Sequence, residues 1–116
     1  MDEGWPTEWL RGVLELSVLR ILSEGPTYGY AIATRLEEIG LGTVKGGTLY
    51  PLLARLEEAG RVETEWKVGS RGPGRKYFRL TMAGEIHLAR EADRWDRFSR
   101  LTHGFICGTQ PDEEER

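Results

Sequence analysis

The spacing of apolar residues predicts two helices in the first third of the chain. In residues 9–22, apolar side chains lie on nearly every side of a helix, so we expect this helix to be buried, in part by another subunit. The pair Gly25-Pro26 ends it. Thr27 is a suitable N-cap for a second helix, which Gly40 closes. The apolar stripe of the second helix is Tyr28, Ile32, Leu36 and Ile39.

A third helix is predicted to begin near Gly47 or Thr48 and to stop at Gly60. Its leucines follow the i, i+3, i+4, i+7 spacing of one helical face and are Leu49, Leu52, Leu53 and Leu56. Pro51 is compatible with this helix because it lies in the first turn, where a backbone N–H has no intrahelical partner. The residues on the opposite, outward side are Thr48, Pro51, Ala54 and Arg55.

The hydrophobic period then changes from that of a helix to that of a strand. Residues 62–68 alternate between uncharged and charged side chains, and a second strand covers residues 75–80. The glycine-rich turn between them, residues 69–74, predicts a hairpin with a basic tip. We expect Trp66 in the core of this hairpin rather than as an exposed stacking platform.

Thr81 is predicted to cap a last helix over residues 81–108. We expect residues 1–8 to be a flexible lead-in and residues 109–116 to be a disordered acidic tail. The first and last helices carry more apolar residues than one small core needs, which predicts a homodimer. The expected interface residues are Leu14, Leu88, Ala92, Trp95, Phe98 and Leu101.

Three helices followed by a hairpin is the element order of a winged helix-turn-helix. We therefore predict a mainly α fold with a small β-hairpin, in which residues 9–80 form a winged helix-turn-helix and residues 81–108 form a C-terminal dimerisation helix. In this architecture the third helix enters the major groove of DNA. The sequence suits that role because no acidic residue precedes Glu57 in this helix, so its first turns present no negative charge to phosphates.

The charge distribution supports a nucleic-acid partner, although the whole chain carries a net charge of −3. Residues 45–80 contain eight basic and four acidic residues, a net charge of +4, which leaves −7 for the rest of the chain. We expect Thr48 and Arg55 to contact bases, and the basic tip to contact phosphates. Tyr50 and Tyr77 could instead cover the flanks of their own elements. The expected DNA contacts are Lys45, Thr48, Tyr50, Pro51, Arg55, Arg71, Arg75, Lys76 and Tyr77.

Enzyme classes find little support in the sequence. No glycine-rich phosphate loop precedes a helix, no pair of histidines has the spacing of a zinc protease, and the two histidines do not suggest a Ser-His-Asp set. His103 and Cys107 could share a helix face, but further ligands are lacking, so we expect neither a metal nor a cofactor. The alternative to DNA binding is a winged helix used only for protein contacts, and the basic tip argues against it.

The cysteine content and the ends of the chain bear on the compartment. A single cysteine, Cys107, excludes an internal disulfide and favours the reducing cytoplasm. We expect Cys107 to pack at an interface or lie exposed rather than to sense redox changes. No apolar run reaches the ~20 residues of a membrane span, and the acidic N-terminus lacks the basic start of a secretory signal.

Four short motifs resemble one known family. They are Thr-Tyr-Gly-Tyr at 27–30, Gly-Thr-Leu-Tyr-Pro-Leu-Leu at 47–53, Arg-Leu-Glu at 55–57, and Arg-Lys-Tyr-Phe-Arg-Leu-Thr at 75–81. Over residues 9–105 the chain resembles the PadR-type transcriptional regulators. The resemblance implies a cytoplasmic bacterial homodimer that dimerises through its C-terminal helix, usually a repressor that a small-molecule effector releases from its operator. A two-fold dimer would read a pseudo-palindrome.

The resemblance also implies a place for the effector. Some members of the family bind flat aromatic drugs between paired tryptophans of the last helix, and the matching position is Trp95. Trp9 and Leu16 fall where the first helix would line that pocket. Trp95 could instead be an ordinary aromatic residue of the dimer interface. Arg61 departs from the family, which usually has an aliphatic residue there, and implies an altered strand edge or an added phosphate contact.

Overall fold

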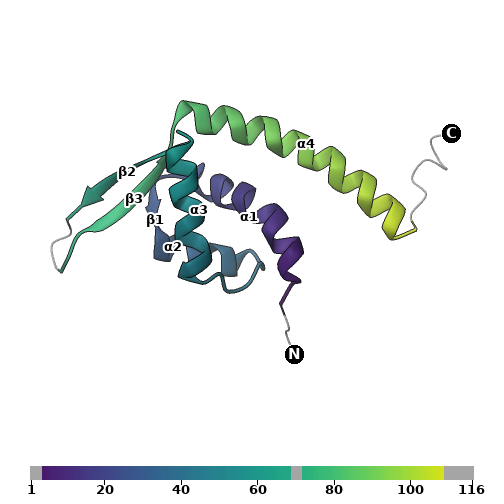
Figure 1. The fold of residues 1–116 in the computed structure, drawn as a ribbon, viewed down its shortest axis with the longest axis horizontal. Coiled ribbons are helices and arrows are strands. Elements are labelled where there is room, and N and C mark those ends of the chain that lie inside the picture. Colours follow the sequence, from purple (N-terminus) through teal and green to yellow (C-terminus); the bar gives the residue numbers. More distant parts are fainter. Residues whose placement is uncertain (1–3, 69–71, 109–116) are drawn as a thin grey trace.

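The protein is described here by a computed structural model that covers residues 4–68 and 72–108. Its elements are α1 (Thr7–Leu22), β1 (Thr27–Tyr28), α2 (Gly29–Glu38), α3 (Gly46–Glu58), β2 (Val62–Lys67), β3 (Arg75–Leu80) and α4 (Met82–Ile106). The first three helices form one body, from which the β2–β3 hairpin, here called the wing, extends on one side (Figure 1). The later part of α4 extends beyond the body on the other side (Figure 1). The predicted mainly α winged helix is confirmed.

The core lies between α1, α2, α3 and the base of the sheet. All four leucines of the predicted stripe of α3 are buried. In α2, Ile32 and Leu36 are buried, but Ile39 follows the end of the helix and is 46% exposed. The core residues are Leu14, Val18, Leu19, Ile21, Leu22, Ile32, Leu36, Leu49, Leu52, Leu53, Leu56, Val62, Phe78 and Leu80. The core is thus complete without the outer half of α4.

Thr27 begins a short strand, and the prediction that it caps α2 was wrong. Thr27 pairs with Phe78 and Tyr28 pairs with Tyr77, so β1 lies antiparallel to β3 in a three-stranded sheet of order β1-β3-β2. This pairing supplies partners for backbone groups that the outer edge of β3 would otherwise leave open. α2 consequently begins at Gly29, with Tyr28 as its N-cap and without a side-chain cap.

Trp66 lies on the surface, and its predicted place in the hairpin core was also wrong. Along β2, Val62 is buried and Thr64 is half-buried, but Trp66 is 67% exposed. These three residues alternate correctly for one face of a strand. The wing extends away from the helical body (Figure 1), and the exposure of this face accordingly rises from Val62 to Trp66 along β2.

Thr81 links the base of the wing to α4 and confirms the predicted helix cap. Its hydroxyl accepts a 3.0 Å hydrogen bond from the N–H of Gly84 and donates one of 2.7 Å to the carbonyl of Gly60. Gly84 is the buried residue of α4, and a Cβ there would overlap the backbone carbonyl of Arg61. The start of α4 is therefore packed directly against the turn that joins α3 to β2.

Two ion pairs fix the connections around α1. Arg35 donates two hydrogen bonds to Glu24, at 3.1 and 3.0 Å, which lower the pKa of Glu24 below its ordinary value and raise the pKa of Arg35. The guanidinium of Arg61 lies 4.0 Å from Glu15 of α1. The unusual arginine at 61 therefore contacts α1 in this structure.

Some predicted features fall outside the described residues. They are residues 1–3 of the predicted lead-in, the tip residues 69–71, which include Arg71, and the tail 109–116. The helix predicted from residue 9 begins at Thr7. Within the described residues, no helix is both long and apolar enough to cross a bilayer.

Candidate nucleic-acid interface

The outward face of α3 does not pack against the core, and the first turn of this helix contains no acidic residue. Its leucines are buried, while Thr48, Pro51 and Arg55 on the other side are exposed. The helix is started by Lys45, whose carbonyl accepts 2.9 Å hydrogen bonds from the N–H groups of Thr48 and Leu49. An exposed N-terminal half of this kind can approach a polyanion without electrostatic repulsion.

Two basic residues of the wing lie beside α3 and β1. The guanidinium carbon of Arg75 lies 4.4 Å from the centre of the Tyr28 ring. The Nζ of Lys76 lies 3.9 Å from a carboxylate oxygen of Glu57, near the end of α3. Both cations are exposed to solvent. The Lys76–Glu57 pair bridges the wing and α3, a contact that the sequence did not reveal.

The two tyrosines proposed from the sequence differ in their surroundings. Tyr77 is half-buried, and its ring meets that of Tyr28 edge to face with 5.4 Å between the ring centres. Tyr50 is 52% exposed, and its ring lies across the start of α2, where a Cβ on Gly29 would overlap its hydroxyl. Tyr77 therefore covers β1, whereas Tyr50 both covers α2 and offers free ring surface.

A concave surface lies between α3, the start of α2 and the wing, and we call it the aromatic cleft. It encloses about 440 Å³. Its lining residues are Tyr28, Gly29, Tyr30, Tyr50, Trp66, Gly74, Arg75, Lys76 and Phe78. Sequence reasoning did not assign Tyr30 or Trp66 to any site. The sequence placed Tyr30 in a helix and Trp66 in a strand, but it did not show that both side chains stay exposed in the folded protein.

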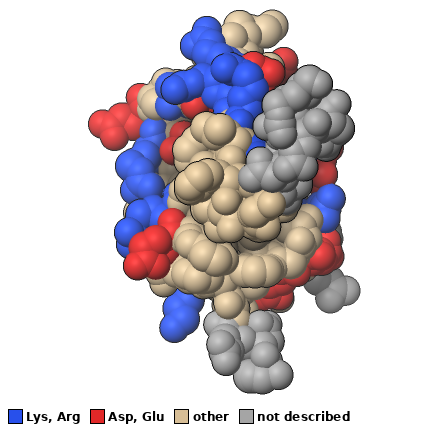
Figure 2. Space-filling view, turned by 90° about the vertical axis from the view of Figure 1, so that its right-hand side faces the viewer, with Lys and Arg blue, Asp and Glu red and all other residues tan. Residues whose placement is uncertain are grey.

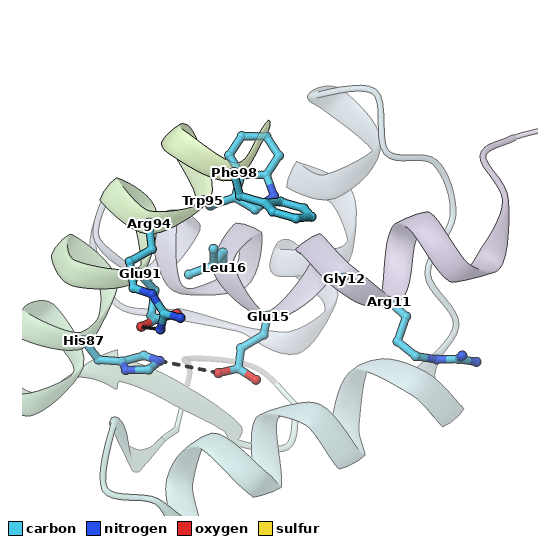
Figure 3. Close-up of a pocket in the computed structure, with 9 residues that line it drawn as sticks. All are labelled: Arg11, Gly12, Glu15, Leu16, His87, Glu91, Arg94, Trp95 and Phe98. Carbon is cyan, nitrogen blue, oxygen red and sulfur yellow. Dashed lines mark hydrogen bonds and ion pairs between the residues drawn. The ribbon is translucent and has the colours of Figure 1, made fainter. Parts of the chain in front are cut away.

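A second concave surface lies between α1 and α4, away from the wing. Leu16 of α1 and Trp95 and Phe98 of α4 form its apolar part (Figure 3). Across the cavity, which measures about 390 Å³, the Nε2 of His87 lies 3.8 Å from a carboxylate oxygen of Glu15. The remaining lining residues are Arg11, Gly12, Glu91 and Arg94, of which Arg11 points away from the others (Figure 3).

Leu16 and Trp95 also line a larger groove of about 800 Å³, whose walls include Arg35 of α2 and Leu80 of β3 as well as α1 and α4. The sequence-based effector site is therefore assembled in part, since these two residues lie together. Trp9 is 64% exposed and is not among the described residues that line either hollow. It lies near the start of α1, whereas Leu16 is two turns further along that helix.

The residues expected at a dimer interface divide into two groups. Trp95, Phe98 and Leu101 are 43%, 61% and 71% exposed, and Ala92 is also exposed. Leu88 is half-buried against the core. Leu14 is only 5% exposed within the single chain, so it has almost no surface left for a partner and its assignment to the interface is withdrawn.

The end of the molecule where α4 terminates has an uncharged area bordered by charged side chains (Figure 2). Cys107 is exposed at this end of α4. Among residues 4–68 and 72–108, no group of three or more histidine, cysteine, aspartate or glutamate side chains could hold a metal ion. The pair His103 and Cys107 therefore gains no further ligand from the described part of the chain.

Comparison with known proteins matches residues 18–90 to the Transcriptional regulator PadR-like family. The chain is 30% identical to a transcriptional regulator of Mycobacterium tuberculosis, over 84% of this chain and 89% of that protein. It superposes on a PadR-like transcriptional regulator of Bacillus cereus with a TM-score of 0.77 and 34% identity, covering 86% of this chain and 97% of that one. A PadR family transcriptional regulator of Eggerthella lenta gives a TM-score of 0.77 at 35% identity, covering 85% and 86%.

Proposed function

The chain belongs to the Transcriptional regulator PadR-like family, and we propose that it regulates transcription by binding a specific sequence of double-stranded DNA. The observation that carries this proposal is the outward face of α3, where Thr48, Pro51 and Arg55 are exposed and the first turn holds no acid. A helix of this kind fits the major groove, which is about 12 Å wide.

We propose that the contacts divide by role. Thr48, in the first turn of α3, and Arg55, in its last turn, contact base or groove edges, because both lie on the exposed face of this helix. Lys45, Arg75 and Lys76 contact phosphates and fix the orientation of the protein on the duplex. Arg71 belongs to the same basic tip by its place in the sequence. Because Lys76 is paired with Glu57 in the single chain, a DNA phosphate must compete with that carboxylate for the ammonium group.

We further propose a homodimer formed through α4. Trp95, Phe98 and Leu101 expose large apolar surfaces on a helix whose outer half the core does not cover. Exposed apolar residues repeated along one helix mark an interaction surface. A two-fold dimer would place the two α3 helices on half-sites roughly 34–36 Å apart along a pseudo-palindromic operator.

The regulator is proposed to act as a repressor that a planar aromatic effector releases. The cavity between α1 and α4 supports this idea because Leu16, Trp95 and Phe98 form its apolar part. In a dimer, a flat ligand could stack on Trp95 and its symmetry mate, which adds about 0.5–1.5 kcal/mol beyond burial of area. Release requires that the effector bind the DNA-competent and free forms with different affinities.

The decisive experiment is selection of bound duplexes from a random pool by the full chain. The expected result is one enriched pseudo-palindromic sequence, which fluorescence anisotropy then shows to bind more tightly than a scrambled duplex. Arg55→Ala should reduce that preference, whereas the exposed Arg97 on α4 offers a control substitution, Arg97→Ala, that should not. Failure to enrich any duplex, with no binding at low salt, would leave the protein-interaction alternative.

A further inference from the structure

The aromatic cleft has the chemistry of a site for an anion that also carries an apolar face. Its nine lining residues include two cations, Arg75 and Lys76, and no acid. Three tyrosine hydroxyls and the indole N–H of Trp66 add neutral hydrogen-bond donors. The carboxylate of Glu57 lies 3.9 Å from Lys76, but Glu57 is not among the described residues that line the cleft. A negatively charged ligand therefore meets complementary charge there.

The rings of the cleft are surface groups rather than core groups. Tyr30, Tyr50 and Trp66 are 74%, 52% and 67% exposed. Trp66 and Lys76 are cross-strand partners, so the indole and the ammonium group come from adjacent positions of the wing. These three rings stay exposed in the single chain although the core between α1, α2, α3 and the base of the sheet is complete.

The position of the cleft indicates which part of DNA would reach it. Tyr50 belongs to α3 and Trp66 to the wing, so the cleft lies directly beside the helix proposed to enter the major groove. The sugar–phosphate backbone borders the major groove, whereas the bases of a duplex stay stacked inside. A deoxyribose offers an apolar face and its phosphate offers the negative charge.

We propose that the aromatic cleft seats one deoxyribose-phosphate unit of the strand next to α3, with the sugar against the indole of Trp66 and the phosphate towards Lys76, its cross-strand partner on the same face of the wing. This inference rests on the proposed function and extends it, because it assigns Trp66 and Tyr30 to DNA binding. The indole acts through apolar contact and a neutral donor. Its contribution to affinity therefore differs in kind from that of a lysine, because it releases no counterion from the DNA.

The test is fluorescence anisotropy of the full chain with a labelled mixed-sequence duplex over a series of salt concentrations. Trp66→Ala should weaken binding by about tenfold, the loss typical of an aromatic anchor, with the salt slope unchanged. Trp66→Phe, which keeps a ring, should recover most of the affinity. Tyr30→Ala should weaken binding to a smaller extent. The matched control is Trp9→Ala, which removes an equally exposed indole far from the cleft along the chain.

The outcomes separate this inference from the proposed function. If wild-type protein binds no duplex, the proposed function fails and the inference fails with it. If wild-type protein binds and Lys76→Ala lowers the salt slope, but Trp66→Ala and Trp66→Phe both bind within twofold of wild type, only the cleft assignment is overturned. A loss confined to single-stranded DNA would also overturn it, because it would indicate stacking on bases. Circular dichroism melting of each variant shows that the surface substitutions leave the fold intact.

Discussion

The indole Nε1 of Trp5 donates a 2.8 Å hydrogen bond to the backbone carbonyl of Gly40. Trp5 precedes α1, and Gly40 begins the loop that connects α2 to α3. Gly40 has φ +100°, a backbone conformation that glycine adopts more readily than other residues. The bond joins the start of α1, the helix that helps to line the α1–α4 cavity, to the approach of the proposed recognition helix.

Trp5→Phe should keep the ring and lose this bond. We expect residues 41–45 to exchange their amide hydrogens faster, because the loop loses one of its attachments, and the free energy of unfolding to fall by about 1 kcal/mol. Hydrogen exchange followed by mass spectrometry measures the first effect. Trp9→Phe is the control, since Trp9 is 64% exposed on the same end of α1. Equal exchange in wild type and Trp5→Phe would show that the bond does not hold the loop.

Gly84→Ala should destabilise the protein by about 1–3 kcal/mol, because the new methyl group overlaps the carbonyl of Arg61, and a backbone atom cannot move aside cheaply. Gly12→Ala in α1 is the matched control. Nothing lies within 4 Å of a Cβ at Gly12, so the substitution should raise stability by about 0.5–1 kcal/mol through helix propensity. Urea unfolding measures both. Shifts of the same sign would contradict the packing assigned to Gly84.

Thr81→Ala should cost about 1–2 kcal/mol of stability, because it removes both the cap of α4 and the bond to the Gly60 carbonyl. Thr81→Ser keeps the hydroxyl and should retain most of that stability. Denaturant midpoints of the two variants give the comparison. Identical losses in Ala and Ser would mean that the methyl group of Thr81, and not its hydroxyl, stabilises this joint.

Lys76→Ala should weaken binding to all duplexes alike and should reduce the slope of log affinity against log salt by about one. The reason is that a phosphate contact releases a counterion but reads no base. Lys76→Arg keeps the charge and should preserve the slope. Anisotropy titrations with the selected operator and a scrambled duplex measure both quantities. An altered sequence preference with an unchanged slope would rule out the phosphate role.

Trp95→Ala should abolish the quenching of tryptophan fluorescence by flat aromatic compounds while leaving the dimer folded, since the ring forms part of the apolar wall of the α1–α4 cavity. Sedimentation checks the oligomeric state. Trp9→Ala, which changes an indole outside that cavity, should leave the response in place. A full response in Trp95→Ala would identify Trp95 as a packing residue only.

The local features of this protein could be predicted from its sequence. The leucine stripe of α3, the alternation of β2 and the Thr81 cap all follow from interactions among residues a few positions apart. The wing and the helix order followed in the same way, and with them the winged-helix fold. The basic and acid-free stretches were equally visible, because charge is a property of the sequence itself.

The tertiary structure decided what covers each face. Periodicity correctly placed Trp66 on one side of β2, but only the reach of the helical body determines that this side is bare at Trp66 and closed at Val62. Leu14 turned out to be enclosed within the chain for the same reason. The pairing of Thr27 with Phe78 and the bridge from Lys76 to Glu57 join residues far apart in sequence. Short-range spacing carries no information about such contacts, which depend on how the elements meet in space.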